Sequence, residues 1–272
     1  MTPVLRRLSA SLINAIGNIP VVGDALRRVA RRYPEGSVVT IQAGFAAGMR
    51  WQRHHRYVNG YWVGNYEMPI QAALARLLAP GDVFYDVGAN AGFFSLLAAK
   101  QVGDAGRVFA FEPLPENLAS LREQIAVNSL SHVEIVEGAI GATTGTAELS
   151  FASGQNSEAH LGSPKSEGES VTTVPITTLD AFVAAHRRPT LVKVDVEGAE
   201  TAVLEGAPRL LADGTTFLIE LHGIDKGMRV SATLREAGYR LERLDGSVAD
   251  LPEREHHLIA RRPGRHEHHE HE

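Results

Sequence analysis

The feature that most constrains the fold is an alternation, from Pro80 onward, of apolar runs of strand length with stretches of helical periodicity. Such alternation is typical of a parallel sheet with helices on both faces, because each parallel strand needs a crossover to return to the same edge. The runs that read as strands are Val83–Val87, Arg107–Phe111, Val133–Val136, Leu191–Val194, Thr216–Leu221, Tyr239–Arg243 and His256–Ala260. The stretches that read as helices are Phe93–Gln101, Leu114–Asn128, Leu179–Ala185, Ala199–Leu211 and Ser231–Ala237. The sequence therefore predicts an α/β fold built on a seven-strand, mostly parallel sheet.

One segment, at about residues 146–176, departs from this rhythm. Thr146–Ser150 and Ser170–Pro175 alternate between apolar and polar residues, as two antiparallel strands do. Between them lies a polar, glycine-rich stretch, Ala152–Glu169. We predict an inserted β-hairpin with a mobile tip that serves as a lid over the active site.

The chain is expected to comprise an N-terminal extension over residues 1–66, an α/β domain over residues 67–262 and a His/Glu-rich tail over residues 263–272. The tail is of low complexity and is predicted to be disordered, whether it is natural or a purification tag. We therefore exclude it from the candidate site.

The beginning of the extension, Met1–Gly23, combines arginines with a short apolar stretch that Asn14, Asn18 and Pro20 interrupt. No cleavage site follows, so we predict an amphipathic helix rather than a signal peptide. Further arginines leave a peripheral contact with a membrane or a partner open as the alternative. No apolar run reaches the roughly 18 residues of a membrane span, and we expect a cytoplasmic protein.

Composition excludes several classes of function. The chain has 272 residues and a formal net charge of −5, so no general positive field attracts nucleic acid. It contains no cysteine, which excludes disulfides, thiolate metal sites and cysteine nucleophiles. We expect a small-molecule or glycan partner and no nucleic acid, and the sequence is compatible with a homodimer.

The first predicted strand runs into a glycine-bearing turn, and a helix begins just after Gly92. Glycines there let the backbone approach a ligand and present helix-start N–H groups to it. The dinucleotide pattern G-x-G-x-x-G fails, because Asn90 and Phe93 occupy its second and third glycine positions. The turn instead reads Asp86-x-Gly88-x-Asn90-x-Gly92, with an acid before the first glycine. S-adenosylmethionine (SAM) carries an ammonium and a sulfonium but no pyrophosphate, and a carboxylate suits those cations.

The ends of the next two strands supply the remaining cofactor candidates. Glu112 ends the second strand, about 20 residues after the glycine turn, where an acid can accept both ribose hydroxyls. The alternative for Glu112 is a solvated surface glutamate. The third strand ends near Glu137 and Ala139, where backbone groups would meet the adenine.

Three carboxylates, Asp195, Glu197 and Glu200, follow the fourth strand, at the edge where open α/β sheets bind ligands. The fifth strand, expected beside it, is followed by His222. As alternatives, Glu197 and Glu200 are acids that interact favourably with the positive end of a helix dipole, and His222 is an ordinary loop histidine. The position of His222 favours a group that titrates near neutrality and takes part in proton transfer.

These motifs resemble those of the FkbM-type methyltransferases, over a region from about Tyr61 to Ala260. The similar stretches are Gly64-Asn-Tyr-Glu67, Asp86-Val-Gly-Ala-Asn-Ala-Gly92, Phe111-Glu-Pro113, Thr178-Leu-Asp180, Lys193-Val-Asp-Val-Glu-Gly-Ala-Glu200 and Ile219-Glu-Leu-His222. The resemblance implies SAM as cofactor and a class I methyltransferase, Rossmann-like fold. It also implies O-methylation of a hydroxyl on a sugar or oligosaccharide, a polyketide or a lipid-linked acceptor. Within the motifs it adds Glu67 to the expected cofactor site, whereas Glu137 stands where the family is expected to have asparagine.

Methyl transfer to an alcohol requires alignment of the reacting atoms and removal of the hydroxyl proton. His222 is the predicted base, with Asp195, Glu197 and the lid residue His160 as substitutes. In a second arrangement, Asp195 and Glu220 hold a Mg²⁺ ion that lowers the pKa of the hydroxyl.

Two other functions stay open. One is an NAD(P)-dependent oxidoreductase on a similar sheet, which the glycine spacing disfavours. The other is a catalytically inactive SAM-fold binding protein, which would not need the carboxylates at Asp86, Glu112 and Asp195.

Overall fold

The computed structural model describes residues 33–57, 60–152, 159–162 and 169–262. The chain divides into two compact units, which separate between Tyr66 and Glu67. The amphipathic helix expected at the start of the chain and the expected disordered tail both lie outside the described residues.

The described part of the first unit is a small β structure. Its elements are β1 (Val38–Thr40), β2 (Arg50–Gln52) and the 3-10 helix η2 (Tyr61–Val63). The two strands pair antiparallel, with Val39 opposite Trp51. Trp51 and Tyr61 are buried, with ring centroids 5.0 Å apart, and the guanidinium of Arg53 lies between the rings of Tyr33 and Trp62. Aromatic packing therefore stabilises this short unit.

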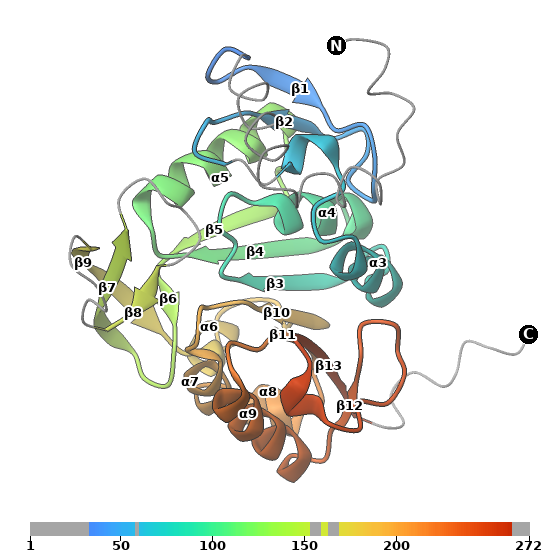
Figure 1. The fold of residues 1–272 in the computed structure, drawn as a ribbon, viewed down its shortest axis with the longest axis vertical. Helices are drawn as coiled ribbons and strands as arrows, with labels where there is room; N and C mark the ends of the chain where they lie inside the picture. Colours follow the sequence, from blue (N-terminus) through green and yellow to red (C-terminus); the bar gives the residue numbers. More distant parts are fainter. Residues whose placement is uncertain (1–32, 58–59, 153–158, 163–168, 263–272) are drawn as a thin grey trace, which may run out of the picture. The chain divides into compact units, whose positions relative to one another are not determined.

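The second unit is built on a seven-stranded sheet in the order β12-β13-β11-β10-β3-β4-β5 (Figure 1). Its strands are β3 (Val83–Val87), β4 (Arg107–Glu112), β5 (Val133–Glu137), β10 (Leu191–Val194), β11 (Thr216–Glu220), β12 (Arg240–Glu242) and β13 (His257–Arg261). The pairings among β5, β4, β3, β10 and β11 are parallel, and β13 runs antiparallel to both of its neighbours. The predicted sheet is confirmed, each strand lying within one or two residues of its expected bounds.

The helices of this unit are α3 (Met68–Leu77), α4 (Phe93–Val102), α5 (Pro115–Asn128), α6 (Leu179–Val183), α7 (Glu200–Glu205), α8 (Pro208–Ala212), α9 (Ile224–Glu236) and the 3-10 helix η3 (Pro252–Arg254). Two expected helices were wrong in extent. The single helix predicted at Ala199–Leu211 is two helices, because Pro208 has no N–H to continue the first and instead begins the second. Helix α9 begins at Ile224 rather than Ser231. Its glycine, Gly227, obscures the helical pattern but packs closely against Glu253.

The predicted insertion forms a separate four-stranded sheet in the order β6-β9-β7-β8. Its strands are β6 (Ala139–Ile140), β7 (Gly145–Ala152), β8 (His160–Leu161) and β9 (Glu169–Thr177). Strands β7 and β9 pair antiparallel along their length, as expected, but β8 pairs with β7 inside the stretch that we expected to be a loop. Most of the predicted mobile tip, residues 153–158 and 163–168, lies outside the described residues.

The core of the second unit fixes one edge of the sheet. Strands β3 and β10 are buried at every position, and their aliphatic and aromatic residues pack against α7, α8 and α9. Because β3, β4, β10 and β11 pair in parallel, their carboxyl ends meet at one edge, where a ligand can reach them. Among the described residues, no helix is long and apolar enough to cross a membrane.

Candidate active site

The turn after β3 requires unusual backbone geometry at three positions. Gly88 and Gly92 have φ of 83° and 93°, and a side chain at Gly88 would overlap the carbonyl oxygen of Asp195. Asn90 is left-handed too, with φ of 49°. Asparagine is among the residues that best tolerate this region, so it can stand where a middle glycine was expected. The turn thus keeps β3 and β10 in close backbone contact.

Asp86, on β3, is fully buried. Its Oδ2 accepts a hydrogen bond from the Ser95 hydroxyl at 2.6 Å. Its Oδ1 accepts none within the described part of the chain and lies 4.0 Å from Lys193 Nζ. Burial raises the pKa of Asp86, and Lys193 and Ser95 act in the opposite direction. A buried carboxylate oxygen without a hydrogen bond raises the free energy of the fold. Asp86 is therefore a candidate to bind a cationic or hydrogen-bond-donating ligand.

Glu112, at the end of β4, is only 4% exposed and is not a solvated surface glutamate. Oε1 accepts from the Leu114 backbone N–H at 2.9 Å and from the Asn117 amide at 3.2 Å. Oε2 accepts from the Asn90 backbone N–H at 2.8 Å. Burial raises the pKa of Glu112 to about 7 despite these donors. The carboxylate therefore holds the glycine turn and the start of α5 in fixed positions.

The other predicted cofactor residues are less enclosed or differ in their role. Glu137 is mostly exposed and forms an ion pair with Arg122. Ala139 is buried at the start of β6. Glu67 has φ of 42° and precedes α3, close enough for its charge to raise the pKa of Lys193. For all three, contact with a cofactor stays a prediction.

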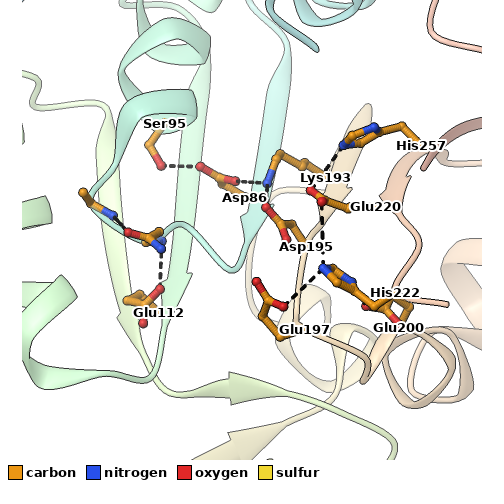
Figure 2. A network of polar contacts seen from close by, with 12 residues as sticks. Asp86, Ser95, Glu112, Lys193, Asp195, Glu197, Glu200, Glu220, His222 and His257 are labelled. Atoms are coloured by element: carbon orange, nitrogen blue, oxygen red, sulfur yellow. Dashed lines mark hydrogen bonds and ion pairs between the residues drawn. The ribbon is translucent and has the colours of Figure 1, made fainter. Parts of the chain in front are cut away.

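Lys193 connects the two halves of the site. It is buried on β10, and its ammonium points to Asp86 and Asp195 (Figure 2). Nζ lies 2.9 Å from Asp195 Oδ2 and 5.0 Å from the centre of the Phe94 ring. Burial alone would lower its pKa, but the carboxylates of Asp195 and Asp86 outweigh burial and raise it. Lys193 therefore remains a cation that neutralises both acids.

His222 follows β11 and is held by Glu200, which is fully buried at the start of α7. The ring Nδ1–H donates to Glu200 Oε1 at 2.7 Å, and the same oxygen accepts from the Gly198 backbone N–H at 2.7 Å. The opposite nitrogen, Nε2, lies 3.3 Å from Glu197 Oε2. The hydrogen bond to Glu200, together with nearby carboxylates, raises the pKa of His222 to about 9. We had expected titration near neutrality, and the surrounding negative charge explains the difference.

Glu220, at the end of β11, lies between two histidines (Figure 2). Its Oε1 is 3.8 Å from His222 Nε2, and its Oε2 is 3.2 Å from His257 Nε2. Burial raises the pKa of Glu220, but the contacts with His257, Lys193 and His222 outweigh burial, and the pKa lies below its usual value. Asp195, Glu220 and His222 each offer a ligand atom, and these atoms lie within 4.8 Å of one another.

The structure brings His222, Asp195, Glu197 and Glu220 together, as their positions in the sequence suggested. His160 lies elsewhere, buried on β8 of the small sheet, with Nε2 3.8 Å from Glu169. Sequence reasoning missed the bridging role of Lys193, although a lysine inside an apolar strand was a usable signal. It also missed His257, which reaches Glu220 through the antiparallel pairing of β13 with β11.

Comparison with known proteins points to one family. The model of the FkbM methyltransferase domain matches residues 86–241, more than half of the chain. Hexuronic acid methyltransferase AglP from Haloferax volcanii is 29% identical over 184 residues, which cover 66% of this chain and 71% of that protein. An arsenite methyltransferase from Halobacterium salinarum is 41% identical over 64 residues, only 24% of this chain and 16% of that protein.

Solved structures also align with this chain, at low sequence identity. An FkbM methyltransferase from Methylobacillus flagellatus aligns with 16% identity and a TM-score of 0.43, covering 90% of this chain and 60% of that one. A precorrin-6y C5,15-methyltransferase from Geobacter metallireducens aligns with 16% identity and a TM-score of 0.44, covering 72% and 86% of the two chains. The family match, with its motifs at the sheet edge described above, shows that this chain belongs to the FkbM family of SAM-dependent methyltransferases.

Proposed function

We propose that this chain is an O-methyltransferase that moves the methyl group of SAM to a hydroxyl of a sugar or oligosaccharide, with His222 as the base. The observation that carries the proposal is the pairing of His222 with the buried carboxylate of Glu200. This pairing fixes which ring nitrogen keeps its proton, and leaves Nε2 at the half-buried edge of the sheet. The acceptor class is supported by the relative named a hexuronic acid methyltransferase.

The residues at the ends of β3 and β4 fit SAM. Asp86 has a buried carboxylate oxygen without a donor, which suits an ammonium group. Glu112 is fixed beside the glycine turn, and one acceptor site on its Oε2 remains for a ribose hydroxyl. When bound, SAM supplies an electrophilic methyl group on a sulfonium.

At the other end of the site, the neutral form of His222 would accept the proton of the acceptor hydroxyl at Nε2. Removal of that proton would make the acceptor oxygen the nucleophile that the electrophilic methyl group requires. Glu200 would stabilise the resulting imidazolium through its hydrogen bond to Nδ1. Glu197 is the substitute base closest to His222, whereas Asp195 is a weaker candidate because Lys193 already neutralises it.

A magnesium ion on Asp195 and Glu220 is the competing arrangement, because these carboxylates and His222 lie close together. The fit is poor in two respects. Lys193 lies 2.9 Å from Asp195, and His257 lies 3.2 Å from Glu220, so a cation or a donor already occupies each acid. Magnesium also prefers oxygen ligands, whereas this cluster includes an imidazole. We therefore favour the base.

Calorimetric titration of the whole chain with SAM and, separately, with NAD⁺ tests the cofactor. We expect SAM to bind and NAD⁺ not to bind. Glu112→Gln should weaken SAM binding about 10- to 100-fold, which corresponds to the loss of a hydrogen bond to a charged group. Glutamine is preferred to alanine because alanine would also remove the acceptor for three protein donors. Binding of NAD⁺, or an unchanged SAM affinity in Glu112→Gln, would contradict the assignment.

A matched control is Glu205→Gln, an exposed glutamate on α7, which should leave the SAM affinity unchanged. Incubation with labelled SAM and a panel of sugars, polyketides and hydroxylated lipids then identifies the acceptor. Label recovered in an ester, an amine or a carbon-linked methyl group rather than an ether would rule out hydroxyl methylation.

A further inference from the structure

We infer that a groove beside His257 binds the acceptor, and that it selects an uncharged, hydroxyl-rich ring over an acidic one. This inference rests on the proposed function and specifies where the acceptor lies and which charge it carries. The groove lies within the second unit and encloses about 410 Å³. Its lining includes Pro69, Ala72, Arg243, Leu244, His256 and His257. That volume lies in the usual range for small-molecule sites.

The groove adjoins the catalytic cluster through one shared side chain, that of His257. His257 lines it and lies 3.2 Å from Glu220, which in turn lies 3.8 Å from Nε2 of His222 (Figure 2). The cofactor candidates Asp86 and Glu112 lie on β3 and β4, on the opposite side of β10 from β11 and β13. An acceptor in the groove would therefore lie on the other side of β10 from the cofactor.

The walls of the groove combine apolar and fixed polar surfaces. Pro69 and Ala72 are three residues apart on α3 and present one face to it, and Leu244 adds a further apolar contact. Arg76 Nη2 donates to the carbonyl of Leu244 at 2.8 Å and so ties this loop to α3. Apolar surface for the C–H face of a ring, with polar groups around it, is the arrangement that a sugar needs.

Arg243 is the cation in the lining, but it is already paired. Its Nε donates to Glu255 Oε1 at 2.8 Å, and Nη1 donates to the carbonyl of Val248 at 2.8 Å. These contacts hold the guanidinium in place and neutralise it. It can therefore donate to a hydroxyl, but it offers little net charge to an acidic ligand.

The adjoining cluster is negative. Its carboxylates are Asp195, Glu197, Glu200 and Glu220. The nearby positive charges are the buried ammonium of Lys193, the protonated form of His222, and the ammonium of Lys226, which lies against Gly198. Once His222 is neutral and able to act as a base, the acids outnumber these cations. A carboxylate on the acceptor would then meet like charge, and such repulsion discriminates between otherwise similar ligands.

The test compares methyl glucoside with glucuronic acid methyl glycoside, which share a ring and differ in the charge at one carbon. Binding is measured by calorimetry on the whole chain loaded with S-adenosylhomocysteine, and transfer is measured with labelled SAM. We expect the neutral sugar to bind at least about tenfold more tightly than the acidic one. Ala72→Trp should weaken neutral-sugar binding by about tenfold or more, because the indole fills the groove. Ala119→Trp, at an exposed position on α5, is the matched control and should bind the sugar as the unaltered chain does.

The outcomes separate this inference from the proposed function. Equal or tighter binding of the acidic sugar, binding of neither sugar, or undiminished sugar binding in Ala72→Trp would overturn the inference. If the unaltered chain did not bind S-adenosylhomocysteine, the proposed function would be contradicted instead. In Ala72→Trp we expect the S-adenosylhomocysteine affinity to stay unchanged, since a loss there would mean that the groove belongs to the cofactor.

Discussion

The acids on the two sides of the sheet edge differ in how deeply they are buried. On the β3–β4 side, Asp86 and Glu112 are 0% and 4% exposed. On the β10–β11 side, the side chains of Asp195, Glu220 and His222 are each about a quarter exposed. Buried acids in fixed hydrogen bonds form a rigid site for one cofactor, because little has to be reorganised when it binds. Partly exposed acids around a histidine leave room for an acceptor and for movement of a proton.

Two buried residues support the groups at this edge. Lys193 lies between Asp86 and Asp195 and so joins the two sides, whereas Glu200 holds His222 on one side. Neither residue is exposed, so neither is expected to touch the acceptor. We therefore expect Lys193 and Glu200 to position other side chains. Substitutions on each side of the sheet edge test this division through their separate effects on binding, stability and turnover.

The largest effect is expected from His222→Ala, on the partly exposed β10–β11 side. Turnover should fall by about 10² to 10⁴, the usual contribution of a general base, while SAM affinity stays nearly unchanged. Steady-state kinetics with the identified acceptor and calorimetry with SAM measure the two quantities. Treatment with EDTA should have little effect on the unaltered enzyme. Near-normal turnover in His222→Ala, together with loss of activity in EDTA that added Mg²⁺ restores, would favour the metal arrangement instead.

Lys193→Met tests the joint between the two sides. The substitution leaves the buried carboxylate of Asp86 without its cation, and removal of one partner from a buried ion pair costs about 3–5 kcal/mol of unfolding free energy. Urea unfolding measures the loss. Lys100→Met, at an exposed position on α4, should change stability by no more than about 0.5 kcal/mol. Equal stability of the two variants would show that Lys193 does not hold the carboxylates together.

Glu200→Gln should produce the smallest effect, a shift in the pH profile. The hydrogen bond to Glu200 is the main cause that raises the pKa of His222 to about 9, so a neutral amide should lower that pKa towards 6.5. The base form is the deprotonated one, so activity should rise at lower pH in the variant than in the unaltered enzyme. The two should converge above pH 9, where both histidines are neutral. The pH dependence of kcat is the measurement, with Glu236→Gln on the exposed part of α9 as the control. An unchanged profile would remove Glu200 from the positioning role.

The same pKa shift bears on stability. Because the folded-state pKa of His222 lies above 6.5, its ion pair with Glu200 stabilises the fold fully below pH 6.5. That contribution is lost as the pH rises through about 9. Stability measured across this range should therefore fall less in Glu200→Gln than in the unaltered chain.

Sequence predicted the fold to the extent that local patterns carry it. Apolar runs located β3, β4, β10 and β11, because burial on both faces demands continuous hydrophobic residues. The helix at Ala199–Leu211 was wrong because its apolar periodicity continues across Pro208, although the backbone cannot. Strand β8 was missed because two residues carry too little pattern to stand out from a polar loop.

By itself, the sequence determined that Asp86, Glu112, Asp195 and His222 follow or end parallel strands, and hence that they share an edge. Only the tertiary structure decided their partners. The antiparallel β13, paired with β11, brings His257 to Glu220, and the first turn of α7 brings Glu200 beneath His222. The reason is physical. The positions of strands along the chain follow from local hydrophobicity, whereas contacts between side chains depend on the register between segments far apart in the chain. That register also brings Glu200 and the other carboxylates to His222, and they raise its pKa from 6.5 to about 9 although burial acts in the opposite direction.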